Sequence, residues 1–145
     1  MTKKSVKVIF DTNVWISFLI GKRLAGIKKL ITRGDIKLIY TEQLLAEIKR
    51  VTQRASLRKY FPEKNVIELL EFMETIGHNT QIEPIHFINR DPKDNFLLDL
   101  IAFSNADYLV TGDKDLLLHN PFKSAKILTP SDFQKEIANI DYSKN

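Results

Sequence analysis

Several residue types that define common classes of functional site are missing from this chain or scarce in it. The 145 residues include no cysteine, which excludes disulfide bonds, thiol catalysis and cysteine-ligated zinc or iron–sulfur sites. The three histidines, His78, His86 and His119, stand singly and lack the paired spacing of a zinc site. No GxGxxG or GKS/GKT phosphate-binding motif occurs either. Thiol, zinc and nucleotide-loop chemistry are therefore not expected.

Long apolar runs and flexible linkers are lacking as well. No apolar stretch approaches the roughly 20 residues of a bilayer-spanning helix, and Lys7 and Asp11 interrupt the apolar start of the chain. We therefore expect no membrane association and, with no cysteine, a cytoplasmic protein. Glycine and proline number only five each, and 43% of the residues are hydrophobic. Residues 1–140 are predicted to form one domain, followed by a frayed tail at 141–145.

Short β-branched segments alternate with helical segments along the chain. Strands are predicted at 5–10, 36–40, 108–110 and 126–128, with a short edge strand at 81–85 as an open alternative. Helices are predicted at 14–19, 23–32, 42–53, 62–76, 93–103 and 130–140. This alternation predicts an α/β fold in which helices cover both faces of a parallel sheet. In such folds ligands bind outside the carboxyl ends of the strands.

Carboxylates follow two of these strands. Asp11 comes directly after the first strand, and Asp113 follows the strand at 108–110. Each alone could be a turn or helix-capping residue, but two like charges at one sheet edge are unfavourable unless a cation joins them. Glu47 lies at the edge of the apolar stripe of the helix at 42–53, where a solvated rim position is the alternative.

Asp94 lies on the core-facing stripe of the helix at 93–103, where a carboxylate needs a partner or a metal. The alternative is a capping box, with Asp91 as the N-cap and Pro92 in the first turn. Four carboxylates from four elements can thus converge at one edge, which suits Mg²⁺ or Mn²⁺. A metal held there lowers the pKa of water and neutralises charge on a phosphodiester.

Basic residues form two runs, and the formal net charge is +4. Three arginines recur at intervals of four residues and are predicted to line one helical face, where they would contact RNA phosphates: Arg50, Arg54 and Arg58. A solvated surface is the alternative for any such run. Among the aromatic residues that could stack on bases, Trp15 and Phe18 are expected in the core, and Tyr60 is left open.

Five sequence segments occur together in a characteristic order. They are VIFDTNVWIS at 8–17, LLAEIKRV at 44–51, RDPKDNFLLDL at 90–100, ADYLVTGDKDLL at 106–117 and ILTPSDF at 127–133. Together they resemble the PIN-domain family, and in particular the VapC-like ribonuclease toxins of bacterial type II toxin–antitoxin systems. The resemblance implies a three-layer α/β/α sandwich with a mainly parallel central sheet, and an endoribonuclease that depends on Mg²⁺ or Mn²⁺.

The resemblance also assigns roles to single residues. Four carboxylates are implied as catalytic metal ligands: Asp11, Glu47, Asp94 and Asp113. Asn13 and Thr111 match polar positions that orient the site, and Asp115 competes with Asp113 as the residue that faces the metal. The number of metals stays open. RNA as substrate, a homodimer and a small antitoxin partner that covers the site are further implications.

Two other functions fit parts of the pattern. A haloacid-dehalogenase-like phosphatase also has an aspartate after its first strand, but it needs a second aspartate two residues later, where this chain has Asn13. The second alternative is a non-catalytic RNA-binding or scaffold domain, which would keep the fold and the remains of a site that no longer catalyses a reaction. The four retained carboxylates favour the nuclease, and an RNA cleavage assay separates the two.

Overall fold

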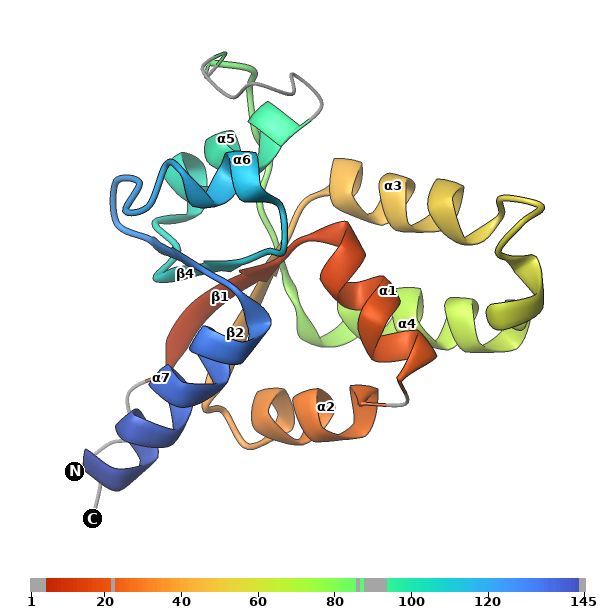
Figure 1. Ribbon diagram of the computed structural model, residues 1–145, viewed down its shortest axis with the longest axis horizontal. Coiled ribbons are helices and arrows are strands. Elements are labelled where there is room, and N and C mark those ends of the chain that lie inside the picture. Colours follow the sequence, from red (N-terminus) through yellow and green to blue (C-terminus); the bar gives the residue numbers. More distant parts are fainter. Residues whose placement is uncertain (1–4, 22, 86, 88–93, 144–145) are drawn as a thin grey trace.

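The computed structural model describes residues 5–21, 23–85, 87 and 94–143, which form strands and helices in alternation (Figure 1). The elements in chain order are β1 (Val6–Phe10), α1 (Thr12–Ile20), α2 (Leu24–Thr32), β2 (Ile36–Tyr40), α3 (Glu42–Thr52), the 3-10 helix η1 (Arg58–Tyr60), α4 (Glu63–Ile76), β3 (His78–Asn79), α5 (Asn95–Ser104), β4 (Tyr108–Val110), α6 (Lys114–Leu117), β5 (Lys126–Leu128) and α7 (Pro130–Ser143).

The five strands form one sheet in the order β3-β2-β1-β4-β5, and all neighbouring strands are parallel. The predicted α/β class with a parallel sheet is thereby confirmed. Pairing continues one residue beyond the central strands, because the Asp11 N–H donates to the Val110 carbonyl at 2.9 Å and the Thr111 N–H donates to the Leu128 carbonyl at 2.9 Å. The carboxyl ends of β1, β4 and β5 therefore lie side by side.

Helices cover both faces of the sheet. In Figure 1 the sheet lies between α5 and α6 on one side and α2 and α7 on the other. An aromatic cluster joins α1 and α7 to β1: the Phe10 ring makes edge-to-face contacts with Trp15, Phe18 and Phe133 at centroid distances of 5.2, 5.5 and 5.7 Å. Trp15 and Phe18 are buried, as predicted for core residues.

The edge strand lies earlier in the chain than the alternative considered from the sequence. Residues 81–85 form no strand; β3 instead follows Gly77 directly, and the Thr80 N–H donates to the Tyr40 carbonyl at 2.8 Å. Pairing with β2 begins as soon as α4 ends, so the chain has left the sheet before it reaches Pro84, which has no N–H to donate.

Several helix ends also differ from the predicted ones. Asp11 caps α1, which starts at Thr12, two residues earlier than predicted. The helix predicted at 93–103 is α5, which begins at Asn95, and residues 91–93 lie outside the described part. The frayed tail at 141–145 stays a prediction, and the last helix, α7, runs to Ser143. Its start is as predicted, because the Asp132 N–H donates to Thr129 Oγ1 at 3.2 Å. Within the described residues, no helix is long and apolar enough to cross a membrane.

Two glycines in different surroundings give a test of this packing. A Cβ on Gly77 would lie 2.5 Å from the Met73 carbonyl oxygen and 2.7 Å from Tyr40 Cδ1, whereas a Cβ on Gly26 within α2 meets nothing within 4 Å. Gly77→Ala should therefore lower the free energy of unfolding by about 1–3 kcal/mol. Gly26→Ala should raise it by about 0.5–1 kcal/mol because alanine favours the helix. Urea denaturation midpoints measure both, and equal midpoints for the two variants would contradict the packing at the end of α4.

Candidate metal centre

Asp11 occupies the middle of the sheet edge, at the carboxyl end of the central strand. Its side chain is only 5% exposed. One carboxylate oxygen, Oδ1, accepts a 2.6 Å hydrogen bond from the Thr12 N–H and caps α1. The other, Oδ2, accepts a 2.7 Å hydrogen bond from the Thr111 hydroxyl. The backbone of β1 and two donors thus fix the carboxylate in one orientation.

Thr111 connects the ends of the two central strands. It is fully buried, and its hydroxyl donates to Asp11 while accepting a 3.0 Å hydrogen bond from the Asp113 N–H. Asp113 in turn caps the short helix α6, because its Oδ1 accepts from the Asp115 N–H at 2.8 Å. Asp11, Thr111 and Asp113 therefore form one hydrogen-bonded chain across β1 and β4.

The charge on Asp11 is electrostatically costly in the apo protein. Burial raises the pKa of the Asp11 carboxyl, hydrogen bonds from Thr111 and Thr12 lower it in part, and the neighbouring Asp113 charge raises it again. A cation between the two carboxylates would remove the repulsion, and hard oxygen donors are what Mg²⁺ and Mn²⁺ prefer. The donor set at this edge therefore fits such a metal.

Glu47 and Asp94 are placed by different elements. Glu47 is half-buried in the second turn of α3, and Asp94 is half-buried directly before α5; each already has interaction partners. Over the described part of the chain, no three acidic or histidine side chains are close enough to hold a metal ion together. The structure thus brings Asp11 and Asp113 together, while the predicted convergence of all four carboxylates is not seen as a preformed group.

Asn13 and Asp115, which were predicted to support the metal ligands, lie in the first turns of two different helices. Asn13 is exposed in the first turn of α1, two residues from Asp11. Asp115 is half-buried in the first turn of α6, and its backbone N–H donates to Asp113. The alternative capping role of Asp91 lies outside the described residues.

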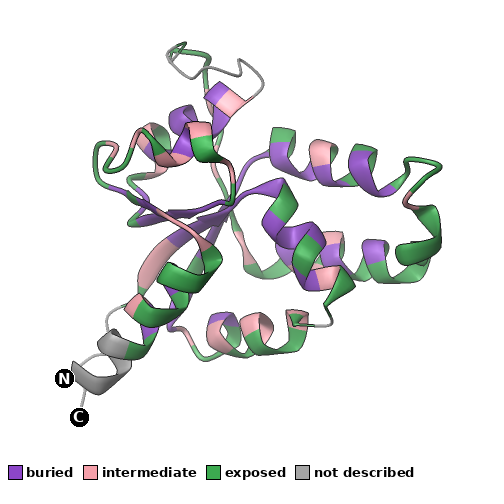
Figure 2. Cartoon of the chain, viewed as in Figure 1, coloured by how far each residue is buried: buried purple, intermediate pink, exposed green. Residues whose placement is uncertain are grey.

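The prediction that Arg50, Arg54 and Arg58 line one helical face is wrong. α3 ends at Thr52, and the Arg54 N–H donates to the Val51 carbonyl in the turn that follows, so the helical spacing stops there. All three arginines are nevertheless exposed: Arg50 lies in the last turn of α3, and Arg54 and Arg58 lie in the connection after it. This end of α3 is remote from the sheet, and the connection is largely exposed (Figure 2). Tyr60 in the same connection is 53% exposed, with the Lys59 ammonium 5.0 Å from its ring centroid.

Asp99 is a buried carboxylate that was not among the predicted site residues. It is 2% exposed, and its Oδ1 accepts from the Ile85 N–H at 3.2 Å. The available signal was the composition of α5, which is apolar almost all round; such a helix buries every side, including its off-stripe positions. Asp99 attaches the segment before residue 86 to α5 and lies outside the Asp11–Thr111–Asp113 chain.

Residues 7–115 match the PIN domain family. The chain belongs to this family. It is also 31% identical over 147 residues to uncharacterized protein MJ1680 of Methanocaldococcus jannaschii, with 94% of each chain covered. The crystal structure of PAE2754 from Pyrobaculum aerophilum has the same fold, at a TM-score of 0.58 and 12% identity over 97% of this chain and 99% of that one. PIN domains are generally nucleases and usually use divalent metal ions.

Metal binding to this PIN domain should be visible as a gain in stability. Mn²⁺ at ~100-fold above its dissociation constant should raise the free energy of unfolding by about 2.7 kcal/mol, because the metal binds only the folded state. Thermal melts with and without Mn²⁺ measure the gain, which Asp11→Asn should abolish. Glu68→Gln, an exposed change on α4, is the matched control and should keep it.

Without metal, the raised pKa of Asp11 determines whether Asp11→Asn raises or lowers the stability of the fold. A protonated Asp11 is favoured by folding, so its stabilising contribution is present below the ordinary pKa of 3.8 and is lost as the pH rises through the raised value. Asp11→Asn should therefore be at least as stable as the wild type at pH 7 without metal. Identical Mn²⁺ responses of wild type and Asp11→Asn would exclude this carboxylate as a ligand.

Proposed function

We propose that this PIN domain is an endoribonuclease that depends on Mg²⁺ or Mn²⁺ and hydrolyses RNA phosphodiester bonds. The observation that carries the proposal is the Thr111 hydroxyl, which joins Asp11 and Asp113 at the centre of the carboxyl edge. Two carboxylates are held close despite their mutual repulsion, at the place where parallel α/β sheets bind ligands. A purely structural turn does not need that arrangement.

Each residue of the edge has a role in this proposal. Asp11 and Asp113 would hold the cation, while Thr111 orients the Asp11 carboxylate and positions the Asp113 backbone. Glu47 and Asp94 supply further negative charge from α3 and from the start of α5, and exposed Asn13 contacts the substrate or a bound water. When bound, the metal supplies charge neutralisation on the phosphate and a lowered pKa for water. Attack by water on the phosphorus, in line with the O3′–P bond that breaks, would give a 5′-phosphate on one product and a 3′-hydroxyl on the other.

RNA is favoured as the polyanion by the basic surface of the chain. The net charge is +4, and three exposed arginines lie in the last turn of the helix that carries Glu47 and directly after it: Arg50, Arg54 and Arg58. Our proposal extends to the biological role: this ribonuclease acts as the toxin of a toxin–antitoxin pair, forms a homodimer and is covered by a small antitoxin protein. The supporting argument for that extension is the sequence resemblance to VapC-like toxins.

Cleavage of single-stranded RNA tests the proposal and the choice between two neighbouring aspartates. Wild-type protein should cleave end-labelled RNA with Mn²⁺ or Mg²⁺ and not with EDTA. Asp113→Asn should lower the rate by orders of magnitude, yet keep the fold because asparagine caps a helix about as well as aspartate. Asp115→Asn, on the same short helix, should cleave normally. The reverse pattern would move the ligand to Asp115, and no cleavage by wild type would favour the non-catalytic alternative.

The exposed arginines should contribute to binding through phosphate contacts. Replacing Arg50, Arg54 and Arg58 with alanine should weaken RNA binding uniformly across sequences. The slope of log K against log salt should decrease by roughly 0.7 per lost contact on a single strand. The control variant removes the same total charge from other exposed sites, by replacing Lys37, Lys123 and Lys135 with alanine. Equal affinities and salt slopes for the two triple variants would mean that only the net charge matters.

A further inference from the structure

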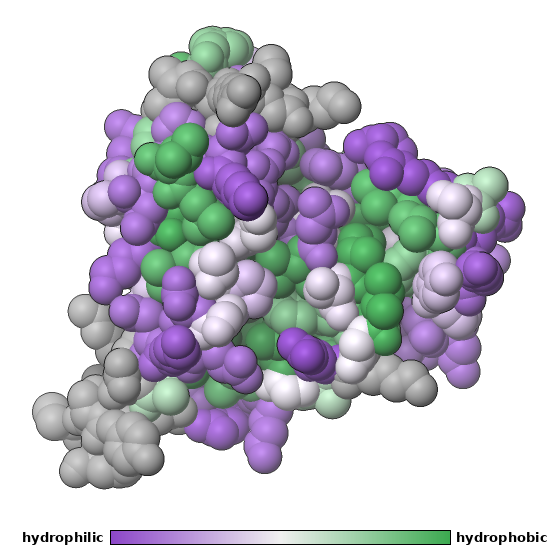
Figure 3. Space-filling view, viewed as in Figure 1, coloured by the Kyte–Doolittle hydropathy of each residue, from purple (hydrophilic) through white to green (hydrophobic). Residues whose placement is uncertain are grey.

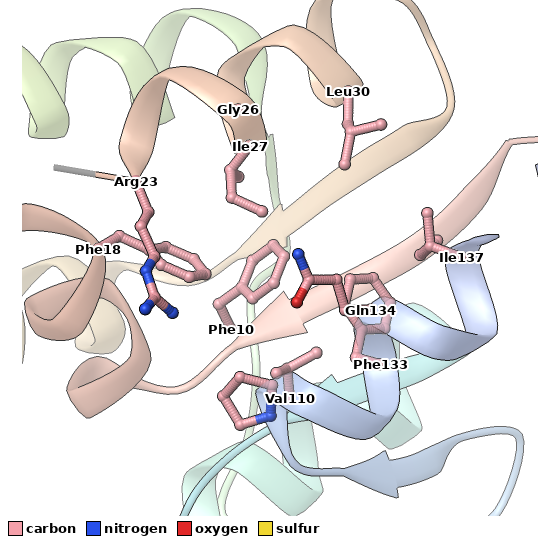
Figure 4. A pocket seen from close by; sticks show the side chains of 11 residues that line it. Phe10, Phe18, Arg23, Gly26, Ile27, Leu30, Val110, Phe133, Gln134 and Ile137 are labelled. Carbon is pink, nitrogen blue, oxygen red and sulfur yellow. The ribbon is translucent and has the colours of Figure 1, made fainter. Parts of the chain in front are cut away.

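A pocket of about 510 Å³ opens on the sheet face that carries Phe10, between α1, α2 and α7 (Figure 4). This volume falls within the roughly 300–1,000 Å³ that small-ligand sites occupy. In Figure 3 an apolar hollow lies near the centre of the view, over the sheet between α2 and α7. The pocket is separate from the carboxylate chain, and none of the roles described above uses it.

The lining of the pocket is apolar with a polar rim. Phe10 and Val110 form its floor, and Phe18 and Phe133 stand on the walls from α1 and α7. Two polar side chains, Arg23 at the start of α2 and Gln134 on α7, approach it from opposite walls, as Figure 4 shows, and both are exposed. The described lining residues include no acidic one. Such a lining suits a planar apolar group that carries an anion and hydrogen-bonding edges.

The floor of the pocket lies at the two strand ends after which the candidate metal centre begins. Phe10 and Val110 directly precede Asp11 and Thr111 in the chain, and the Asp11 N–H donates to the Val110 carbonyl at 2.9 Å. The pocket floor and the carboxylate edge are thus one residue apart along both strands, which is the spacing that leads us to consider one ligand for both. In a nucleotide the planar apolar group beside the phosphate is the base.

We propose that this pocket binds one nucleobase of the RNA substrate, next to the phosphate that is cleaved; this inference rests on the proposed function. Gln134 hydrogen-bonds to the edge of the base, and Arg23 contacts the phosphate of that nucleotide. Aromatic and apolar walls of this kind hold bases in other nucleic-acid enzymes. The nuclease therefore prefers one base, or one class of base, at a fixed position beside the cut.

Gly26 allows the pocket to be filled without harm to the fold. It lines the pocket from α2, and a Cβ built on it meets nothing within 4 Å. Gly26→Leu places a side chain in the pocket and also improves helix propensity. Ala25→Leu is the matched control, because Ala25 is exposed on the same helix and does not line the pocket. Thermal melts of both variants verify that each is folded.

Trp15, the single tryptophan of the chain, is a natural probe of the pocket. Its ring packs edge-to-face on Phe10 and Phe18, at centroid distances of 5.2 and 5.9 Å, and both of these line the pocket. Metal-free protein is titrated with AMP, CMP, GMP and UMP while tryptophan fluorescence is recorded. At least one mononucleotide should change the emission. Gly26→Leu should weaken its binding by about tenfold or more, while Ala25→Leu should bind as the wild type does.

Two further readouts complete the test. Arg23→Gln should reduce the preference for a mononucleotide over its nucleoside without changing nucleoside affinity. On RNA of randomised sequence with Mn²⁺, Gly26→Leu should lose the base preference at one position beside the cut. Absence of any mononucleotide response would overturn the proposal. So would unchanged binding and base preference in Gly26→Leu, or a change in oligomeric state as its only effect, which would assign the face to a second copy of the chain.

The outcomes separate this inference from the proposed function. Mononucleotide binding that depends on Gly26, in a protein that cleaves no RNA, would support the pocket and refute the nuclease. RNA cleavage with the same base preference in wild type and Gly26→Leu would support the nuclease and refute the pocket.

Discussion

The hydrogen bond from the Thr111 hydroxyl to Asp11 Oδ2 is the interaction on which the candidate site depends. It joins two residues that are 100 positions apart in the chain, across the ends of β1 and β4. The same hydroxyl accepts a hydrogen bond from the Asp113 backbone N–H, so one side chain orients the Asp11 carboxylate and positions the backbone that carries Asp113. Because Thr111 is fully buried, the core restricts its rotamer, and the Asp11 carboxylate is oriented before any ligand arrives. The arrangement has an electrostatic cost, because burial and the Asp113 charge both raise the pKa of the Asp11 carboxyl and so disfavour its charged form.

The order of the strands explains why this bond forms at the centre of the sheet. After β1 the chain builds β2 and β3 on one side, and it then returns to add β4 and β5 on the other. The ends of β1 and β4 therefore meet where the chain leaves the sheet in two directions. The connection that begins with α1 leads from β1 to β2 on one side, and the connection through α6 leads from β4 to β5 on the other. Parallel α/β sheets bind ligands at such switch points. Asp11 and Asp113 also cap these two helices, so the residues that begin the helices are the ones that form the edge.

The sequence predicted the type and order of the elements and the shared edge of the parallel strands, but it missed where some elements begin and end and could not fix distances that depend on how helices are directed. Asp11 and Asp113 were expected at one edge because parallel strands end together, and the structure links them through Thr111. The strand alternative at 81–85 was wrong because pairing began immediately after Gly77. The four-residue spacing of the arginines continued past the end of α3, where spacing no longer implies a shared face. The distances from Glu47 and Asp94 to Asp11 depend on the directions of α3 and α5 in the fold. The periodicity of apolar residues in the sequence does not determine those directions.

The two surfaces assigned to RNA lie at different distances from the edge and so act on different parts of a substrate. The pocket shares its floor with the strands that carry Asp11 and Thr111, so a single nucleotide can reach both. α3 has 11 residues, so at 1.5 Å per residue its far end lies about 16 Å from its start beside β2. A chain of several nucleotides is needed to extend from the edge to Arg54 and Arg58. In the function we propose, the arginines would contribute an affinity that increases with substrate length and depends on salt, whereas the pocket would contribute discrimination between bases at one position.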